Sequence, residues 1–376
     1  MKSKIIIQRS ENMNINNNHI VQEDMLHILR SLDTTEKNKF QNSTILITGC
    51  AGFLGFYFLN FFTSQAKVLK IKKIIALDNF MLGYPQWLEQ LQTQYTSLIS
   101  VQKFNIISDE IQKVEFASDA NLIIHAASVA SPVFYRQYPL ETLDANVWGL
   151  RNLLEFYVDK KIGGFLFFSS SEIYGNPAPD KIPTNEEYRG NVACVGPRAC
   201  YDESKRIGET ICSIFAQKYN LPITIARPFN NYGPGIKIDD KRLPADFAKS
   251  ILTNQDIVIL SDGKPTRTLC YIADAIAGYL KVLLHDKFDY FNIGMDKPEF
   301  SISELAEVYA EVGKQYFNFD KGIVYQIPED ENYLTDCPAR RCPNIDKART
   351  ILDYSPSITL QEGVRRFLTF LAETER

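Results

Sequence analysis

Short apolar runs alternate with amphipathic segments along most of the chain, and this alternation is the main structural signal in the sequence. Runs rich in Ile, Leu, Val and Phe, each bounded by polar or turn residues, predict strands at 43–48, 73–77, 99–104, 122–125, 165–168 and 223–226. Apolar residues at helical spacing predict helices between them, notably over 140–158 and 201–219. Strands that alternate with helices form parallel sheets, so the pattern predicts an α/β fold with a doubly wound parallel sheet.

The two ends of the chain depart from this pattern. Residues 1–40 are expected to form an N-terminal extension, partly disordered at its asparagine-rich stretch 12–18, with one short helix between Ile20 and Leu32 that docks on the main domain or on a partner. Helical patterns at 303–312 and 360–371, with short strands near Val258 and Val324, predict a smaller C-terminal α/β lobe. We therefore expect a cofactor domain over 41–232, to which 267–294 return, and a substrate lobe over 233–376.

A glycine loop follows the first predicted strand directly. The loop, G-C-A-G-F-L-G at 49–55, leads into an apolar helix, which is the context of a Rossmann dinucleotide site. Its glycines permit a tight turn, close approach of the backbone to a pyrophosphate, and close packing of the helix on the strand. The next strand ends at Asp78, near the interval of about 20 residues at which a carboxylate binds the adenosine ribose. A carboxylate there repels the 2′-phosphate of NADP, so the predicted cofactor is NAD.

The composition restricts the class of protein and its partners. The chain has 376 residues, a formal net charge of −4 and seven cysteines without C-x-x-C pairs. A net negative charge does not favour binding to nucleic acid or to an anionic membrane, and the cysteine spacing predicts no metal site. We expect a cytoplasmic protein, because the sequence shows neither a leader peptide nor an apolar run long enough to span a membrane.

Tyr201 and Lys205 are the first candidate for catalytic chemistry. Four residues apart on a predicted helix, they lie on one face, and an ammonium near a phenol favours the phenolate. The pair would then act as a general base on a sugar hydroxyl. Such a spacing is also frequent by chance, in which case both side chains belong to a solvated helix face.

A second candidate follows the fifth predicted strand, where Ser169, Ser170, Ser171 and Glu172 form a polar cluster. In open α/β sheets ligands bind outside the carboxyl ends of the strands, so this cluster predicts part of a substrate site. His125 also ends a strand, and we interpret it as a packed residue rather than a catalyst.

Several further motifs together resemble the extended short-chain dehydrogenase/reductase family that acts on nucleotide sugars, over roughly residues 43–370. Within that family they are most similar to the UDP-glucuronate decarboxylases. The motifs are S-P-V-F-Y-R-Q-Y-P at 131–139, S-E-I-Y-G at 171–175, G-P-R-A-C-Y-D-E-S-K-R at 196–206 and R-R-C-P-N-I at 340–345.

The resemblance implies roles for individual residues. The residues implied to bind NAD are Gly49, Gly52, Phe53, Leu54, Gly55, Asp78, Asn79, Asn105, Ile106, Ala126, Asn146, Tyr201, Lys205 and Pro228. Those implied to act in catalysis are Tyr201, Lys205, Ser170, Ser171, Glu172 and Arg341. Those implied to bind the substrate are Ser131, Tyr135, Asn230, Arg242, Arg267 and Arg341. The family's helices also imply a homodimer, through 140–158 and 201–219.

The implied reaction on the UDP-linked sugar begins with Tyr201, which takes the C4 hydroxyl proton while hydride passes to NAD. The resulting β-keto acid loses carbon dioxide, with Arg341 on the carboxylate and Glu172, if protonated near neutrality, delivering or relaying a proton. Hydride then returns to C4 and gives UDP-xylose.

Other readings remain open at this point. The same scaffold serves nucleotide-sugar 4-epimerases and 4,6-dehydratases, although a dehydratase needs an Asp-Glu pair where this chain has Ser171-Glu172. A non-catalytic NAD-binding regulatory protein is a further alternative. The chain also departs from the decarboxylase pattern, with Asp144 in place of a lysine, Gly235 in place of an arginine, and Asn105-Ile106 where an aspartate usually meets the adenine.

Overall fold

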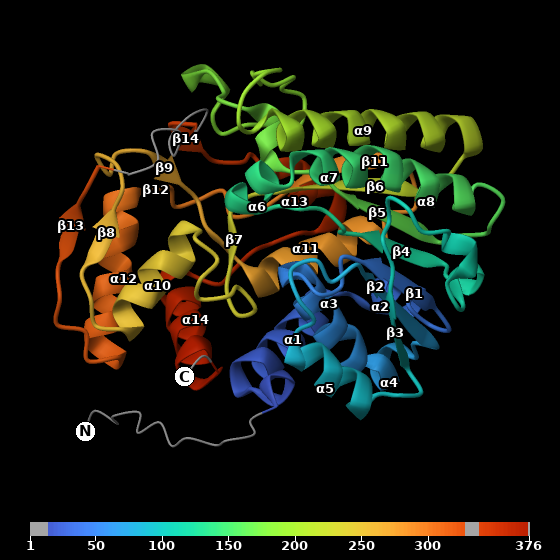
Figure 1. Cartoon of the computed structure of the whole chain (residues 1–376), viewed down its shortest axis with the longest axis horizontal. Helices are drawn as coiled ribbons and strands as arrows, with labels where there is room; N and C mark the ends of the chain where they lie inside the picture. The colour runs from blue at the N-terminus through green and yellow to red at the C-terminus, as the bar shows by residue number, and fades with distance from the viewer. Residues whose placement is uncertain (1–13, 328–337, 375–376) are drawn as a thin grey trace.

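A seven-stranded parallel sheet forms the centre of the molecule in the computed structural model, which describes residues 14–327 and 338–374 (Figure 1). The strand order is β11-β6-β5-β4-β1-β2-β3. The strands are β1 (Thr44–Thr48), β2 (Lys73–Asp78), β3 (Ile99–Lys103), β4 (Leu122–His125), β5 (Gly164–Phe168), β6 (Ile223–Pro228) and β11 (Asp289–Ile293). All six neighbouring pairs are parallel, which confirms the doubly wound sheet. The chain order reverses between β1 and β4, where such sheets bind ligands.

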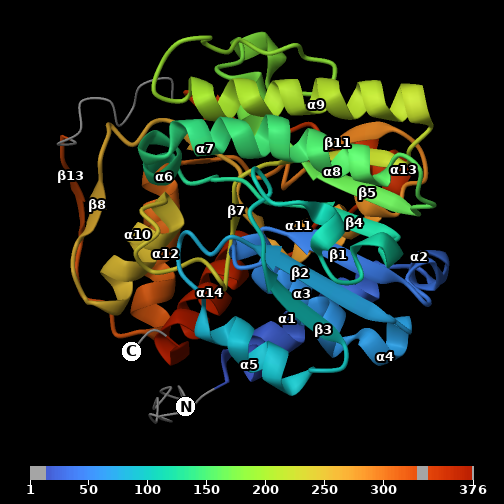
Figure 2. The ribbon, with the colours of Figure 1, turned by 45° about the vertical axis from the view of Figure 1, so that its right-hand side comes forward.

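Helices cover both faces of the sheet, which is why its strands read as continuous apolar runs. On one face Ile45 and Ile47 join the core formed with α3 (Phe53–Ser64) and α11 (Ile272–Leu283). On the other face Leu46 joins the core under α8 (Leu150–Tyr157) and α9 (Ala199–Tyr219). Figure 2 shows α8 and α9 side by side along one side of the sheet.

The segment predicted as one helix over 140–158 is divided. It comprises α7 (Pro139–Asp144), a π turn η4 (Ala145–Gly149) and α8. A π turn shifts the hydrogen-bond register by one residue, and such turns are frequent at functional sites. Here it buries Asn146, whose side-chain amide donates to the Ser204 hydroxyl of α9 at 2.9 Å.

The C-terminal part forms a smaller α/β lobe beside the sheet, as the sequence predicts (Figure 1). Its helices are α10 (Leu243–Leu252), α12 (Ile302–Tyr316) and α14 (Leu360–Thr374), and its strands pair as β8 (Ile257–Ile259) with β13 (Ile323–Tyr325). A second small sheet joins β9 (Thr266–Arg267) with β12 (Phe300–Ser301) and β14 (Arg340–Arg341). The structure also contains α4 (Ala66–Leu69), α5 (Gln86–Gln94), α6 (Pro132–Gln137), α13 (Asp346–Leu352), β7 (Asn231–Tyr232) and β10 (Cys270–Tyr271).

The N-terminal segment packs on the main body from residue 14 onward. Asn14 and Asn18, in the stretch expected to be mobile, cap a 3-10 turn and α1 (His19–Ser31), and a second helix follows, α2 (Thr34–Lys39). The fully buried Asp24 of α1 accepts hydrogen bonds from Tyr57 of α3 and Tyr271 of β10 and pairs with Arg366 of α14. The extension therefore contacts both the sheet's helices and the lobe. Within the described ranges, no helix is long and apolar enough to cross a membrane.

Candidate active site

The glycine loop leaves the N-terminus of α3 open. Gly49 has a φ of +72°, and a Cβ there would lie 2.7 Å from the Ala126 carbonyl group. A Cβ on Gly55 would lie 2.2 Å from the Cys50 carbonyl oxygen. Packing therefore requires both glycines. Gly52, the N-cap of α3, would place its Cβ at an ordinary 3.4 Å from the nearest atom, the Gly49 carbonyl oxygen, so the fold does not demand a glycine there.

Asp78 ends β2 beside this loop. Its carboxylate accepts the backbone N–H groups of Ala51 at 3.0 Å and Phe80 at 2.8 Å, and burial raises its pKa. Asn79 follows it and accepts the N–H of Met81.

Other residues predicted to bind the cofactor follow neighbouring strands. Asn105 and Ile106 lie after β3, where the Asn105 N–H donates to Asp109 and Ile106 packs in the core beside the π turn. Ala126 follows β4, and Pro228 ends β6. The carboxyl ends of the parallel strands thus gather these residues along one edge of the sheet.

The residues at this edge fit a dinucleotide cofactor. The open helix N-terminus supplies N–H donors for a pyrophosphate, and Asp78 supplies acceptors for a ribose. Two buried polar atoms nearby, the Ser128 hydroxyl and the Asn146 side-chain oxygen, have no hydrogen-bond partner among the described residues.

Tyr201 and Lys205 are buried on the first turns of α9. A Cβ on Gly208 would lie 2.5 Å from the Phe167 ring, so the glycine lets this helix approach β5 closely. The Lys205 ammonium donates to the Phe168 carbonyl oxygen at 2.7 Å and lies 5.6 Å from the Tyr201 ring centroid. Both candidates therefore reach the carboxyl end of β5.

The electrostatics of this pair differ from the prediction. Burial raises the pKa of Tyr201 to about 12, although a hydrogen bond with Ser170 opposes the rise. Burial also lowers the pKa of Lys205 to about 7, so near neutrality the lysine is only partly charged. The expectation that the pKa of Tyr201 is lowered is wrong for this structure, because burial raises it.

Ser170, Ser171 and Glu172 enter the 3-10 turn η5 (Ser171–Tyr174) directly after β5. The Ser170 hydroxyl accepts the N–H of Glu172 at 3.2 Å and contacts Tyr201. Glu172 pairs through one oxygen, Oε2, with Arg198 at 2.6 Å and with Arg341 at 2.7 Å. The cluster predicted at the strand end thus lies against Tyr201.

The expectation that Glu172 is protonated near neutrality is wrong. Burial opposes ionisation, but the charges of Arg341 and Arg198 outweigh it and hold the pKa of Glu172 below its ordinary value. Glu172 is therefore an ionised carboxylate held by two guanidinium groups.

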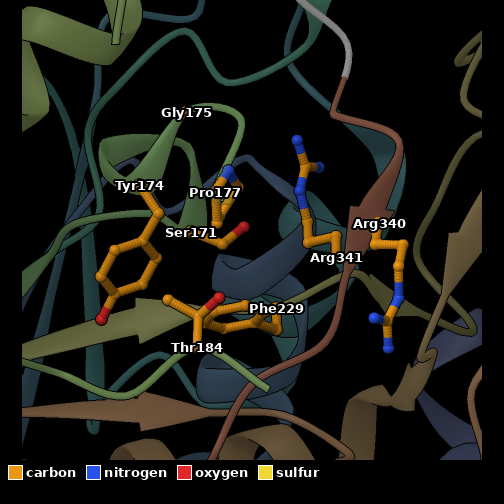
Figure 3. A pocket seen from close by; sticks show the side chains of 8 residues that line it. All are labelled: Ser171, Tyr174, Gly175, Pro177, Thr184, Phe229, Arg340 and Arg341. Carbon is orange, nitrogen blue, oxygen red and sulfur yellow. The ribbon is translucent and has the colours of Figure 1, made fainter. Parts of the chain in front are cut away.

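Arg341 borders a small pocket (Figure 3). Ser171, Tyr174, Gly175, Pro177, Thr184, Phe229, Arg340 and Arg341 line it. Figure 3 shows the two arginines of β14 extending to opposite sides of the strand, Arg341 toward Ser171. Arg340 pairs with Glu299 at 2.7 Å, whereas Arg341 also approaches the Asn230 side-chain oxygen at 3.5 Å.

The residues predicted to bind substrate lie in three places. Ser131 is the N-cap of α6, and Tyr135 of the same helix stacks on the Tyr201 ring with the centroids 5.2 Å apart. Asn230 lies beside Arg341, as stated above, and donates to the Thr268 carbonyl oxygen.

Arg242 and Arg267, which are also predicted to bind the substrate, have partners within the chain. Arg242 pairs with Asp240 and lies 5.6 Å from the Phe53 ring centroid, next to the glycine loop. Arg267 donates to the backbone carbonyls of Thr266 and Pro338, on the strand beside Arg341.

Sequence reasoning missed Arg198 and Asp202 as members of this site. Both are buried at the start of α9, and Arg198 Nε lies 3.6 Å from an Asp202 oxygen. Their spacing of four residues beside Tyr201 was a visible signal for an ion pair. The contact of Arg198 with Glu172 had no such signal in the sequence, because Glu172 lies on another element.

The fold is a Rossmann fold, and the candidate site places a tyrosine and a lysine one helical turn apart at the carboxyl end of β5. The model of the NAD dependent epimerase/dehydratase family matches residues 45–294. The chain therefore belongs to this NAD-dependent family, which confirms the predicted cofactor and family.

Curated relatives support the same assignment. UDP-glucuronic acid decarboxylase 6 of Arabidopsis thaliana is 33% identical over 86% of this chain and 87% of its own length. UDP-glucuronic acid decarboxylase 1 of Danio rerio is 29% identical over 87% of this chain and 72% of its own length.

Solved structures agree in fold. An epimerase from Methanothermobacter thermautotrophicus has a TM-score of 0.75 at 26% identity, covering 91% of this chain and 95% of its own. UDP-glucuronic acid 4-epimerase from Bacillus cereus, solved with UDP-glucuronic acid and NAD, has a TM-score of 0.70 at 22% identity, covering 87% and 98%.

Proposed function

We propose that the protein decarboxylates UDP-glucuronate to UDP-xylose. The observation that carries the proposal is the Glu172–Arg341 pair beside Ser170 and Tyr201, because it supplies a partly buried guanidinium for a sugar carboxylate next to a candidate base. Curated relatives with this activity in their names support it. We assign NAD to residues 41–232 with 267–294, and the nucleotide sugar to the lobe 233–376.

Each residue has one part in the proposed reaction. When bound, NAD takes the C4 hydrogen with its electron pair and later returns it. Tyr201 receives the C4 hydroxyl proton, assisted by Ser170, which contacts its phenol. Because this phenol is a weak acid in the buried site, we infer that binding of cofactor and substrate lowers its pKa before proton transfer.

Arg341 stabilises the carboxylate and the enolate that follows loss of carbon dioxide. Glu172 fixes that guanidinium and, being ionised, is not the proton donor. The net reaction takes up one proton at C5, which we assign to water.

A second candidate is 4-epimerisation of the same acidic sugar. It is favoured by the absence of a neutral carboxylic acid at Glu172, since epimerisation needs no proton at C5. A 4,6-dehydratase is disfavoured by Ser171, which stands where that reaction needs an aspartate.

The test is to incubate the full chain and NAD with UDP-glucuronate, UDP-glucose and UDP-galactose separately. Decarboxylation predicts UDP-xylose, labelled carbon dioxide from a C6-labelled sugar, and deuterium at C5 in heavy water. UDP-galacturonate without carbon dioxide would establish the epimerase instead. Tyr201→Phe should lower the rate of either reaction by about a hundredfold or more.

We also propose a homodimer formed through the segment 140–158, which comprises α7, η4 and α8, and through 201–219 of α9. Leu140 of α7 is 72% exposed and Ile214 of α9 is 54% exposed, and Trp148 of η4 and Ile207 of α9 are exposed as well. Sedimentation of the wild type should give twice the monomer mass, and Leu140→Glu with Ile214→Glu should give the monomer. The compartment, expected to be the cytoplasm, stays a prediction from the sequence.

A further inference from the structure

One oxygen of Glu172 is shared by two arginines that come from different parts of the chain. Arg198 lies at the start of α9, on the Rossmann domain, whereas Arg341 lies on β14 of the lobe. Their distances to Oε2 are 2.6 and 2.7 Å, and all three side chains are largely buried. The carboxylate thus joins the two halves of the candidate site.

The two arginines are held differently. Arg198 has a second carboxylate, Asp202, one helical turn away, and its guanidinium lies 5.9 Å from the Tyr135 ring centroid. Arg341 belongs to a strand of two residues, and the contact of its guanidinium with the Asn230 side-chain oxygen is long at 3.5 Å. Glu172 is therefore the main polar partner that holds Arg341.

A substrate carboxylate has to compete with Glu172 for Arg341. If Arg341 turned away and Glu172 had no other cation, a buried carboxylate would lose its compensating charge, which is strongly unfavourable. Arg198 removes this penalty, because its contact with the same oxygen does not depend on Arg341. Arg267 adds positive potential that also favours the ionised Glu172.

We propose that Arg198 is a positioning residue that keeps Glu172 ionised and in place while Arg341 exchanges Glu172 for the carboxylate of the sugar. This inference rests on the proposed function. It predicts that Arg198, without touching the sugar, sets the preference of the site for acidic over neutral nucleotide sugars.

The test uses the full chain loaded with NAD and compares two ligands by calorimetry, UDP-glucuronate and UDP-xylose, which lacks the carboxylate. Arg198→Met should weaken binding of UDP-glucuronate by about tenfold to a hundredfold, the effect of one hydrogen bond to a charged group. Binding of UDP-xylose should change by less than about threefold, and Arg198→Lys should recover part of the loss. The exposed pair of Arg349 with Asp296 offers a matched control, Arg349→Met, which should change neither constant.

The pH profile gives a second readout that a purely structural role would not move. Without Arg198 the pKa of Glu172 rises, so kcat/KM for UDP-glucuronate should fall at a higher pH than in the wild type as the solution is acidified. In a Glu172→Gln background this shift should vanish, and Arg198→Met should no longer change the ratio of the two dissociation constants.

Three results would overturn the inference. They are equal weakening of both ligands by Arg198→Met, effects of Arg198→Met and Glu172→Gln that simply multiply, and an unmoved pH profile. If Arg198→Met does not fold, Arg198→Lys carries the same comparison of the two ligands. If the wild type does not bind UDP-glucuronate, the proposed function and this inference are both overturned. If the wild type decarboxylates UDP-glucuronate but the effects of Arg198→Met and Glu172→Gln are independent of each other, the inference alone is overturned.

Discussion

Tyr135 and Tyr201 lie face to face, with ring centroids 5.2 Å apart and planes inclined by 14°. Both rings are buried, and they form a small apolar cluster with Val129. The stack joins α6 to α9 and fixes the plane of the candidate base. The buried Tyr135 hydroxyl has no hydrogen-bond partner among the described residues, which makes it a candidate contact for the substrate.

Two substitutions separate the ring of Tyr135 from its hydroxyl. Tyr135→Phe keeps the stack, so the free energy of unfolding should change by less than about 0.5 kcal/mol, while KM for UDP-glucuronate rises about threefold to tenfold. Tyr135→Ala leaves a cavity and should lower the free energy of unfolding by about 3–5 kcal/mol. Denaturant titration and steady-state kinetics measure both effects. An unchanged KM for Tyr135→Phe would remove Tyr135 from the substrate site.

The glycine loop offers a matched pair of substitutions. Gly55→Ala places a methyl group 2.2 Å from the Cys50 carbonyl oxygen and should destabilise the fold, whereas Gly52→Ala meets only an ordinary 3.4 Å contact. The free energy of unfolding of Gly52→Ala should therefore lie within about 1 kcal/mol of that of the wild type. It should nevertheless bind NAD about tenfold or more weakly, since a methyl group hinders approach to the N-terminus of α3. Calorimetry with NAD decides, and full affinity in Gly52→Ala would contradict the pyrophosphate role.

Lys205 predicts a pH dependence of stability near neutrality. Burial lowers its pKa to about 7 from the 10.5 of an unburied lysine, so between these values the native protein binds fewer protons than the unfolded chain. The free energy of unfolding should therefore gain a positive contribution as pH rises through this window. In Lys205→Met that contribution should be missing, whereas Lys67→Met, at an exposed position, should retain it. Urea titrations from pH 7 to 10 measure the difference, and identical slopes in the two variants would contradict it.

Local patterns were enough to predict the sheet and the cofactor edge. Strand runs such as 43–48 and the glycine loop at 49–55 carry their information within a few residues, and parallel strands bring their carboxyl ends together. The π turn was not predictable, because an apolar pattern over 140–158 does not reveal one extra residue in a helical turn. The charge of Glu172 was not predictable either, because it depends on Arg198 and Arg341, two cations far away in sequence.

The buried Asp24 makes a prediction with the opposite sign to that of Lys205. Burial raises the pKa of Asp24 to about 6 from the 3.8 of an unburied aspartate, although Tyr57, Tyr271 and Arg366 favour its ionised form. Between these values the native protein binds more protons than the unfolded chain, so this group lowers the free energy of unfolding as pH rises through the window.

Asp24→Asn removes the titration, and the free energy of unfolding of this variant should rise more steeply, or fall less, than that of the wild type from pH 4 to 6. The exposed Glu89→Gln serves as control and should follow the wild type. If Asp24→Asn also follows the wild type, Asp24 titrates alike in the folded and unfolded chain, and the buried contact of α1 with α3 and α14 does not contribute to the pH dependence of stability.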